Sequence, residues 1–200
     1  MDRADTILMR RMDGSLLSQG LTVRAGCRAL IVPKGGGRPE EYRPGTALPA
    51  APAGAVYEIP EKPYAPAFAV LEAFTCLKPD GGVFRPGCCF TCDLRYISPL
   101  GACELLRAIE KDAGSFPDTV TLDMLYMTLR RRAQALCQEA AEAFSGGKAL
   151  PYAHWWQELT DGAAFAASLE RALLPLFNRF GFRLEPGSLR ISGVAPIPLD

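Results

Sequence analysis

The spacing most suggestive of chemistry in this chain is a C-x-x-C motif formed by Cys89 and Cys92, with Cys88 directly before it. Two such thiols hold a zinc ion or exchange a disulfide when they converge across a tight turn or at a helix start. The residues around the motif are typical of a strand, in which successive side chains point to opposite faces of the sheet. Cys89 and Cys92 are therefore expected to diverge, and no second pair of ligands stands at metal spacing. We interpret these cysteines as packing residues and predict no metal site.

An enzyme that used one of these thiols would also need a catalytic base, and His154 is the only histidine in the sequence. Ser-His-Asp and Cys-His sites need a histidine, as does most proton transfer near neutral pH. His154 falls in a predicted aromatic loop with no acid or nucleophile beside it in the sequence. A thiol-dependent enzyme, with Cys89 or Cys92 as nucleophile and His154 as base, remains an alternative, but the expectation is a chain without catalytic residues.

Two further runs resemble binding motifs without meeting their requirements. The glycines at 35–37 lack the G-K-[ST] ending of a phosphate-binding P-loop and the G-x-G-x-x-G spacing of a dinucleotide site. The arginines at 130–132 lie on a predicted helix, where successive side chains point about 100° apart and form no compact patch. The whole chain balances 22 basic against 22 acidic residues. We therefore expect no cofactor and no nucleic-acid partner.

Partner contacts are expected at two places instead. Trp155 and Trp156 are adjacent, two such rings cannot easily be buried in one core, and tryptophan is favoured at interfaces. Residues 1–14 form an N-terminal segment in which Ile7 and Leu8, near basic residues, are typical of an amphipathic helical turn. Such a turn would lie against the domain or on a membrane surface, so these four residues are the candidate partner or membrane contacts.

The composition places the chain among soluble globular proteins. Apolar residues make up 48% and charged residues 22% of the chain. The longest uncharged run, Pro44–Tyr57, is shorter than the about 20 residues of a membrane-spanning helix and is interrupted by prolines. The odd number of cysteines, 7, and their place in apolar segments favour free thiols. We expect a cytoplasmic protein, with any membrane contact at the inner face.

The pattern of apolar residues changes along the chain. The first half predicts short, mostly antiparallel strands: Leu21–Arg24, Ala29–Val32, Val56–Ile59, Ala67–Leu77 and Cys88–Ile97, the last two joined by a turn at 78–82. The second half predicts three helices, at Leu100–Lys111, from Pro117 to Gly146, and from Asp161 to Gly181, and then a closing pair of strands at Phe182–Glu185 and Leu189–Ser192. This order predicts an α+β fold with a single domain over residues 15–200.

The order of these segments resembles that of the SPFH (band 7) family of stomatin, prohibitin and flotillin relatives, and in particular its soluble bacterial branch labelled virion-core-like. The run Leu21–Val32 is similar to that branch's opening strands, and Tyr42–Gly45 to the Pro-Gly turn that follows them. Arg95–Gly101 stands where the family leaves its sheet for a short helix. The run Leu176–Glu185 is similar to the family's closing helix, its glycine and the next strand.

The resemblance implies a domain without an active site that forms homo-oligomers, lies on or near membranes and organises other proteins there. The function expected from the sequence is therefore a non-catalytic scaffold or adaptor. Besides the thiol-dependent enzyme, a small-ligand binding domain with a pocket between sheet and helices remains a second alternative. The partner, the stoichiometry and the cellular process are not specified by the sequence.

Overall fold

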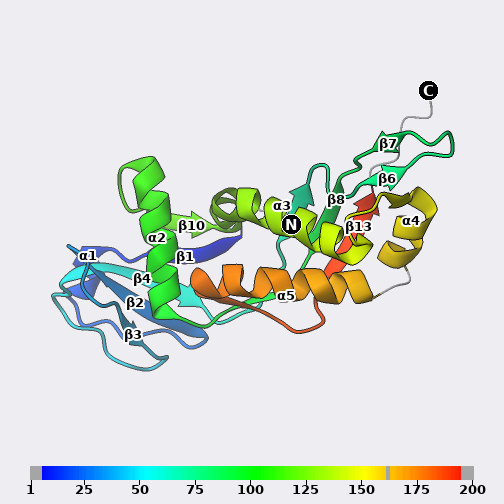
Figure 1. Cartoon of the computed structure of the whole chain (residues 1–200). Coiled ribbons are helices and arrows are strands. Elements are labelled where there is room, and N and C mark those ends of the chain that lie inside the picture. Colours follow the sequence, from blue (N-terminus) through cyan, green and yellow to red (C-terminus); the bar gives the residue numbers. More distant parts are fainter. Residues whose placement is uncertain (1–5, 161–162, 195–200) are drawn as a thin grey trace. The chain divides into compact units, whose positions relative to one another are not determined.

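The computed structural model describes residues 6–160 and 163–194. It confirms the predicted α+β class, with mostly antiparallel strands followed by helices and two closing strands (Figure 1). The chain groups into two compact units. Unit 1 consists of residues 1–64, 95–128 and 178–183, and unit 2 of residues 65–94, 129–177 and 184–200. This grouping does not test independent folding, so a single domain over residues 15–200 stays a prediction.

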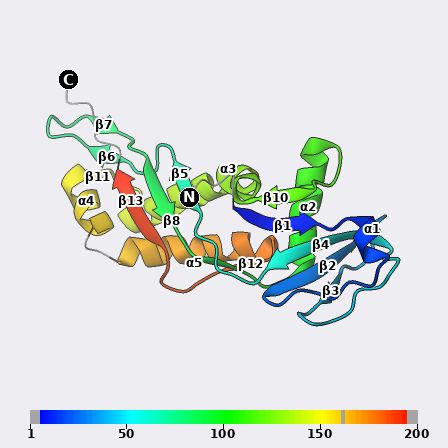
Figure 2. The ribbon, with the colours of Figure 1, turned by 180° about the vertical axis from the view of Figure 1, so that it is seen from behind.

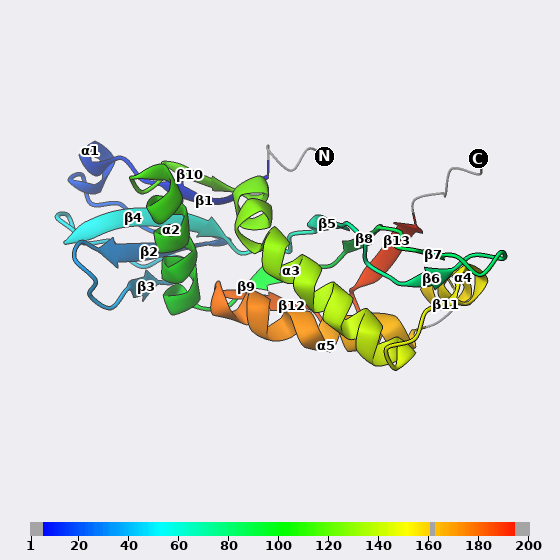
Figure 3. The same cartoon turned by 45° about the horizontal axis from the view of Figure 1, so that its top comes forward.

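Unit 1 is built on a five-stranded antiparallel sheet in the order β10-β1-β4-β2-β3. Its strands are β1 (Ile7–Arg11), β2 (Cys27–Pro33), β3 (Glu40–Tyr42), β4 (Gly54–Pro60) and β10 (Thr119–Thr121). The short helix α1 (Gly14–Leu17) follows β1, and α2 (Pro99–Ala113) lies across the sheet (Figure 3). Leu105, Leu106 and Ile109 of α2 are buried, as expected for the apolar stripe of an amphipathic helix.

The start of α2 is fixed by an unusually close backbone crossing inside unit 1. Ser98 caps the helix by accepting a hydrogen bond from the Gly101 N–H at 3.4 Å, and the Ile97 N–H donates to the Gly181 carbonyl at 2.8 Å. A Cβ atom added at Gly101 would lie 2.1 Å from the nitrogen of Gly181. Gly181 itself has φ +83, a value that favours glycine. Both glycines are therefore required by this crossing.

Unit 2 contains two small sheets. In one, β8 (Cys88–Thr91) lies between β5 (Ala67–Val70) and β13 (Arg190–Val194) (Figure 2). In the other, β6 (Cys76–Leu77) pairs with β7 (Val83–Phe84) as a hairpin and in parallel with β11 (Leu150–Pro151). Helix α4 (Tyr152–Thr160) follows β11 directly. The chain passes between the units within β9 (Leu94–Tyr96), α3 (Leu122–Ser145), α5 (Ala164–Arg179) and β12 (Phe182–Leu184).

Several element predictions differ from the structure. The segment around Ile7 and Leu8 is strand β1 and not an amphipathic helical turn, because it pairs on both sides, with β4 and β10. The residues of the predicted aromatic loop form helix α4. Helix α3 begins at Leu122, since the residues before it form β10. The closing strands are present, and they pair with β9 and β8. The predicted helix cap at Asp161 lies outside the described residues.

Candidate functional site

Three aromatic side chains of unit 2 form a continuous row at the surface. The ring centroids of Phe84 and Tyr152 are 5.9 Å apart, and those of Tyr152 and Trp156 are 6.4 Å apart. Trp156 ends the row and is 49% exposed, whereas Phe84 and Tyr152 are half-buried. We call these three residues the aromatic ladder. Partly exposed aromatic groups of this kind bury a large apolar area when a second surface covers them.

The ladder is positioned by one hairpin and one helix. The turn at residues 78–82 closes the β6–β7 hairpin, where Lys78 N–H donates to the Gly82 carbonyl at 2.8 Å. This hairpin sets Phe84 opposite Cys76, which is buried. Tyr152 and Trp156 are four residues apart on α4, so their side chains lie on one face of the helix. The four-residue spacing is the sequence signal for this pair. It indicates a shared face only when the segment is a helix, whereas the sequence predicts a loop here.

Trp155, predicted as a partner contact, is instead a core residue with only 1% of its surface exposed. Its ring lies 4.5 Å from Phe74 and 5.4 Å from Phe165, and its Nε1–H donates to the Thr75 carbonyl at 3.4 Å. Helical geometry turns it about 100° away from Trp156. Of the two tryptophans, Trp156 therefore carries the candidate contact.

The other two predicted contact residues, Ile7 and Leu8, belong to strand β1. Leu8 is fully buried and Ile7 is half-buried in β1. Neither forms an exposed apolar face, so the structure corrects the prediction of a membrane-facing segment there.

The C-x-x-C motif spans the end of strand β8, with Cys89 inside the strand and Cys92 directly after it. Cys92 is buried, and Cys89 is half-buried. Burial raises the pKa of the Cys92 thiol to about 12, which disfavours the nucleophilic thiolate. His154 is exposed on α4, and among the described residues no hydrogen bond joins it to either thiol. This geometry gives the thiol-dependent enzyme no support.

Cys88 has a different neighbour, the thiol of Cys137 on α3. Hydrogen bonding to Cys137, followed by burial, raises the pKa of Cys88. Both thiols are buried and free. Over the described ranges, no group of three or more His, Cys, Asp or Glu side chains is placed to hold a metal ion.

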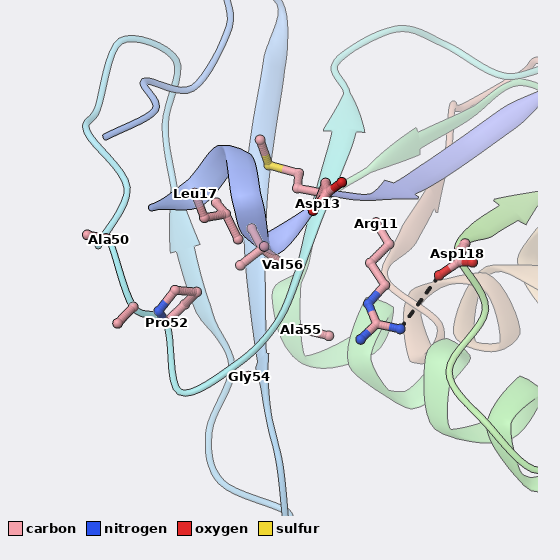
Figure 4. Close-up of a pocket in the computed structure, with 12 residues that line it drawn as sticks. Arg11, Asp13, Leu17, Ala50, Pro52, Gly54, Ala55, Val56 and Asp118 are labelled. Carbon is pink, nitrogen blue, oxygen red and sulfur yellow. Dashed lines mark ion pairs between the residues drawn. The ribbon is translucent and has the colours of Figure 1, made fainter. Parts of the chain in front are cut away.

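Unit 1 carries an open depression of about 580 Å³ at the end of β1 (Figure 4). Its charged groups already have partners within the protein. Arg11 Nη1 lies 3.6 Å from Asp118 Oδ1, and Asp13 Oδ1 accepts a hydrogen bond from the Ser15 N–H at 2.8 Å, which lowers the pKa of Asp13. The rest of the wall is largely apolar, with Leu17, Pro52 and Val56 among its members. This depression therefore lacks the convergent free polar groups of a specific ligand site.

The arginines at 130–132 are exposed on α3, as expected for a solvated helix face. Arg132 pairs with Glu139 at 3.0 Å on the same helix. In the part of the chain that the structure describes, no helix combines the length and the apolar character needed to cross a bilayer.

The searches of family models and of curated proteins identify no relative of the chain: no protein-family model matches it, and a search of curated proteins gives no match. The resemblance to the SPFH family therefore stays a prediction from the sequence, and the aromatic ladder is the surface on which a function can be proposed.

Proposed function

We propose that this chain is a non-catalytic scaffold or adaptor domain that associates with copies of itself, contacts a membrane peripherally and organises partner proteins there. The observation that carries the proposal is the aromatic ladder, which ends in a half-exposed tryptophan. Tryptophan and tyrosine are the residues most enriched both at protein interfaces and at the level of lipid headgroups. The resemblance of the segment order to SPFH proteins supports the same function.

The regular backbone that carries the ladder also favours an interface role. Tyr152 and Trp156 are held on one helix, and Phe84 is held on a hairpin whose strand pairs with buried Cys76. Side chains already ordered before binding lose little conformational entropy when a partner covers them. Truncating a tryptophan at the centre of an interface typically costs about 2 kcal/mol or more, which is about thirtyfold in affinity.

The test compares the wild type with Trp156→Ala in two measurements. Sedimentation velocity over a range of concentrations reports self-association, and flotation with anionic and neutral liposomes reports membrane contact. We expect the wild type to gain mass with concentration or to float, and Trp156→Ala to weaken that behaviour by about tenfold or more in apparent affinity.

Met127→Ala is a matched control, because Met127 is 50% exposed and lies on α3, outside the ladder. It should behave like the wild type in both measurements. A wild-type chain that stays monomeric at the highest concentration and floats with neither lipid would contradict the proposal. Equal loss in the Trp156 and Met127 variants would instead remove the ladder as the contact surface.

A further inference from the structure

A second depression, independent of the aromatic ladder, lies in unit 2 and has a volume of about 470 Å³. Its floor includes Ala73 and Ala141, which are both buried. One wall is the turn after β5, and the opposite wall is the last two turns of α3. A volume of this size suits a small metabolite.

The face of α3 that lines the depression carries mostly polar side chains, unlike a helix face that packs into a protein core. Gln138, Ala141, Glu142 and Ser145 follow the i, i+3, i+4, i+7 spacing of a single helix face, and all four line the depression. Ala141 is small and stands among three polar side chains on this face. This arrangement leaves room for a ligand and offers it polar groups.

The opposite wall is a strained turn that the helix holds in place. Glu72 has φ +49 and is the only described non-glycine residue with a positive φ. The Gln138 side-chain amide donates to the Glu72 carbonyl at 3.2 Å and to the Leu71 carbonyl at 3.5 Å, and the Ala73 N–H donates to the Pro86 carbonyl at 2.8 Å. Strain of this kind costs about 1–3 kcal/mol and is concentrated at functional sites.

Four ionisable side chains, two of each sign, surround the depression. They are Glu72, Arg85, Glu142 and Lys148. In the described ranges none of these four side chains forms an ion pair or a side-chain hydrogen bond with another protein group. Elsewhere on the same helix Arg132 does pair with Glu139. The four charges around the depression are thus still available to a ligand.

We propose that this depression binds a small zwitterion carrying one carboxylate and one ammonium group, of the size of a free amino acid or a dipeptide. Arg85 and Lys148 would hold the carboxylate, and Glu72 and Glu142 the ammonium. A ligand with only an anionic or only a cationic group would leave two of the four protein charges without a partner. It is therefore expected to bind more weakly than a zwitterion. The Thr75 hydroxyl, half-buried at the edge, is a further hydrogen-bonding group.

The inference goes beyond the scaffold function and does not depend on it. It is tested by thermal unfolding and by NMR titration with the free amino acids, with dipeptides, and with their des-amino and carboxamide analogues. A zwitterion at about ten times its Kd should raise the Tm by about 3–5 °C, because it binds only the folded chain. Analogues that lack either charge should produce a clearly smaller shift.

Arg85→Gln and Glu142→Gln are each expected to weaken binding by about tenfold to a hundredfold, since each removes a charged hydrogen-bonding partner. Lys34→Gln and Asp112→Asn are matched controls, because both residues are exposed and lie outside the depression. Far-UV circular dichroism establishes that each variant is folded. The proposal is overturned if no zwitterion binds at about 10 mM, if the singly charged analogues bind equally well, or if the pocket variants bind like the controls.

Discussion

At the scale of single residues, the crossing of Gly101 and Gly181 in unit 1 depends on the absence of a side chain at both positions. The two backbones approach so closely that neither position has room for a side chain. The sequence indicates both glycines only as a helix residue and a helix terminator, since a close approach between distant residues leaves no local pattern. The role of Gly101 is therefore visible only in three dimensions.

Gly101→Ala is expected to lower the free energy of unfolding by about 1–3 kcal/mol, because the added Cβ must displace the Gly181 backbone. Alanine would otherwise stabilise a helix by about 1 kcal/mol relative to glycine, so the sign of the change distinguishes crowding from helix propensity. Urea unfolding at neutral pH measures it. Gly14→Ala is the control, since a Cβ atom there meets nothing within 4 Å. A Gly101→Ala variant as stable as the wild type would show that the crossing can relax.

At the scale of elements, segments with a clear local signal are predicted well and short paired segments are not. The strands β2 and β4 and the helix α2 appear near their predicted places, because β-branched apolar residues followed by a proline mark the two strands and a proline start marks the helix. The strand β1 has no such closing proline, and Arg10 and Arg11 follow its apolar residues directly. Its identity is set by partners that are distant in sequence, which no local pattern reveals.

Helix α4 explains why only part of the candidate surface could be predicted. Two adjacent tryptophans indicate that one of them points outward, but not which one, because the answer depends on the phase of the helix. The phase is fixed by the aromatic cluster that Trp155 joins with Phe74, Phe144 and Phe165. These residues come from four separate parts of the chain, and so the sequence alone could not establish their contact.

Trp155→Ala is expected to lower the free energy of unfolding by about 3–5 kcal/mol, because it removes the largest side chain of this cluster and leaves a cavity. Trp156→Ala, one residue away, should change it by less than about 0.5 kcal/mol, as a half-exposed surface substitution. Chemical denaturation monitored by circular dichroism compares the two. Equal losses in both variants would contradict the assignment of one tryptophan to the core and the other to the surface.

At the scale of the whole molecule, buried groups that ionise at high pH occur in both units. In unit 1, burial raises the pKa of Tyr57 to about 12, and its hydroxyl donates to the Pro117 carbonyl at 2.7 Å. In unit 2, burial raises the pKa of Cys76 to about 11 and that of Cys92 to about 12. Burial disfavours the charged, deprotonated form of each group. The folded chain therefore holds these three protons more strongly than the unfolded chain does.

The free energy of unfolding should therefore be fully maintained below the ordinary thiol pKa of 9.0 and should fall as the pH rises toward about 11 or 12. The expected slope is up to about 1.4 kcal/mol per pH unit for each group that titrates only on unfolding. Urea unfolding under reducing conditions, repeated between about pH 8 and about pH 11, measures this slope.

The Cys76→Ala variant should be less stable at every pH because of its cavity, but its free energy of unfolding should decline less steeply above about pH 9. Val70→Ala, which removes buried apolar atoms in the same unit, should lose stability while keeping the wild-type slope. A wild-type free energy that is constant over this range would show that these thiols and this phenol ionise as readily in the folded chain as in the unfolded one.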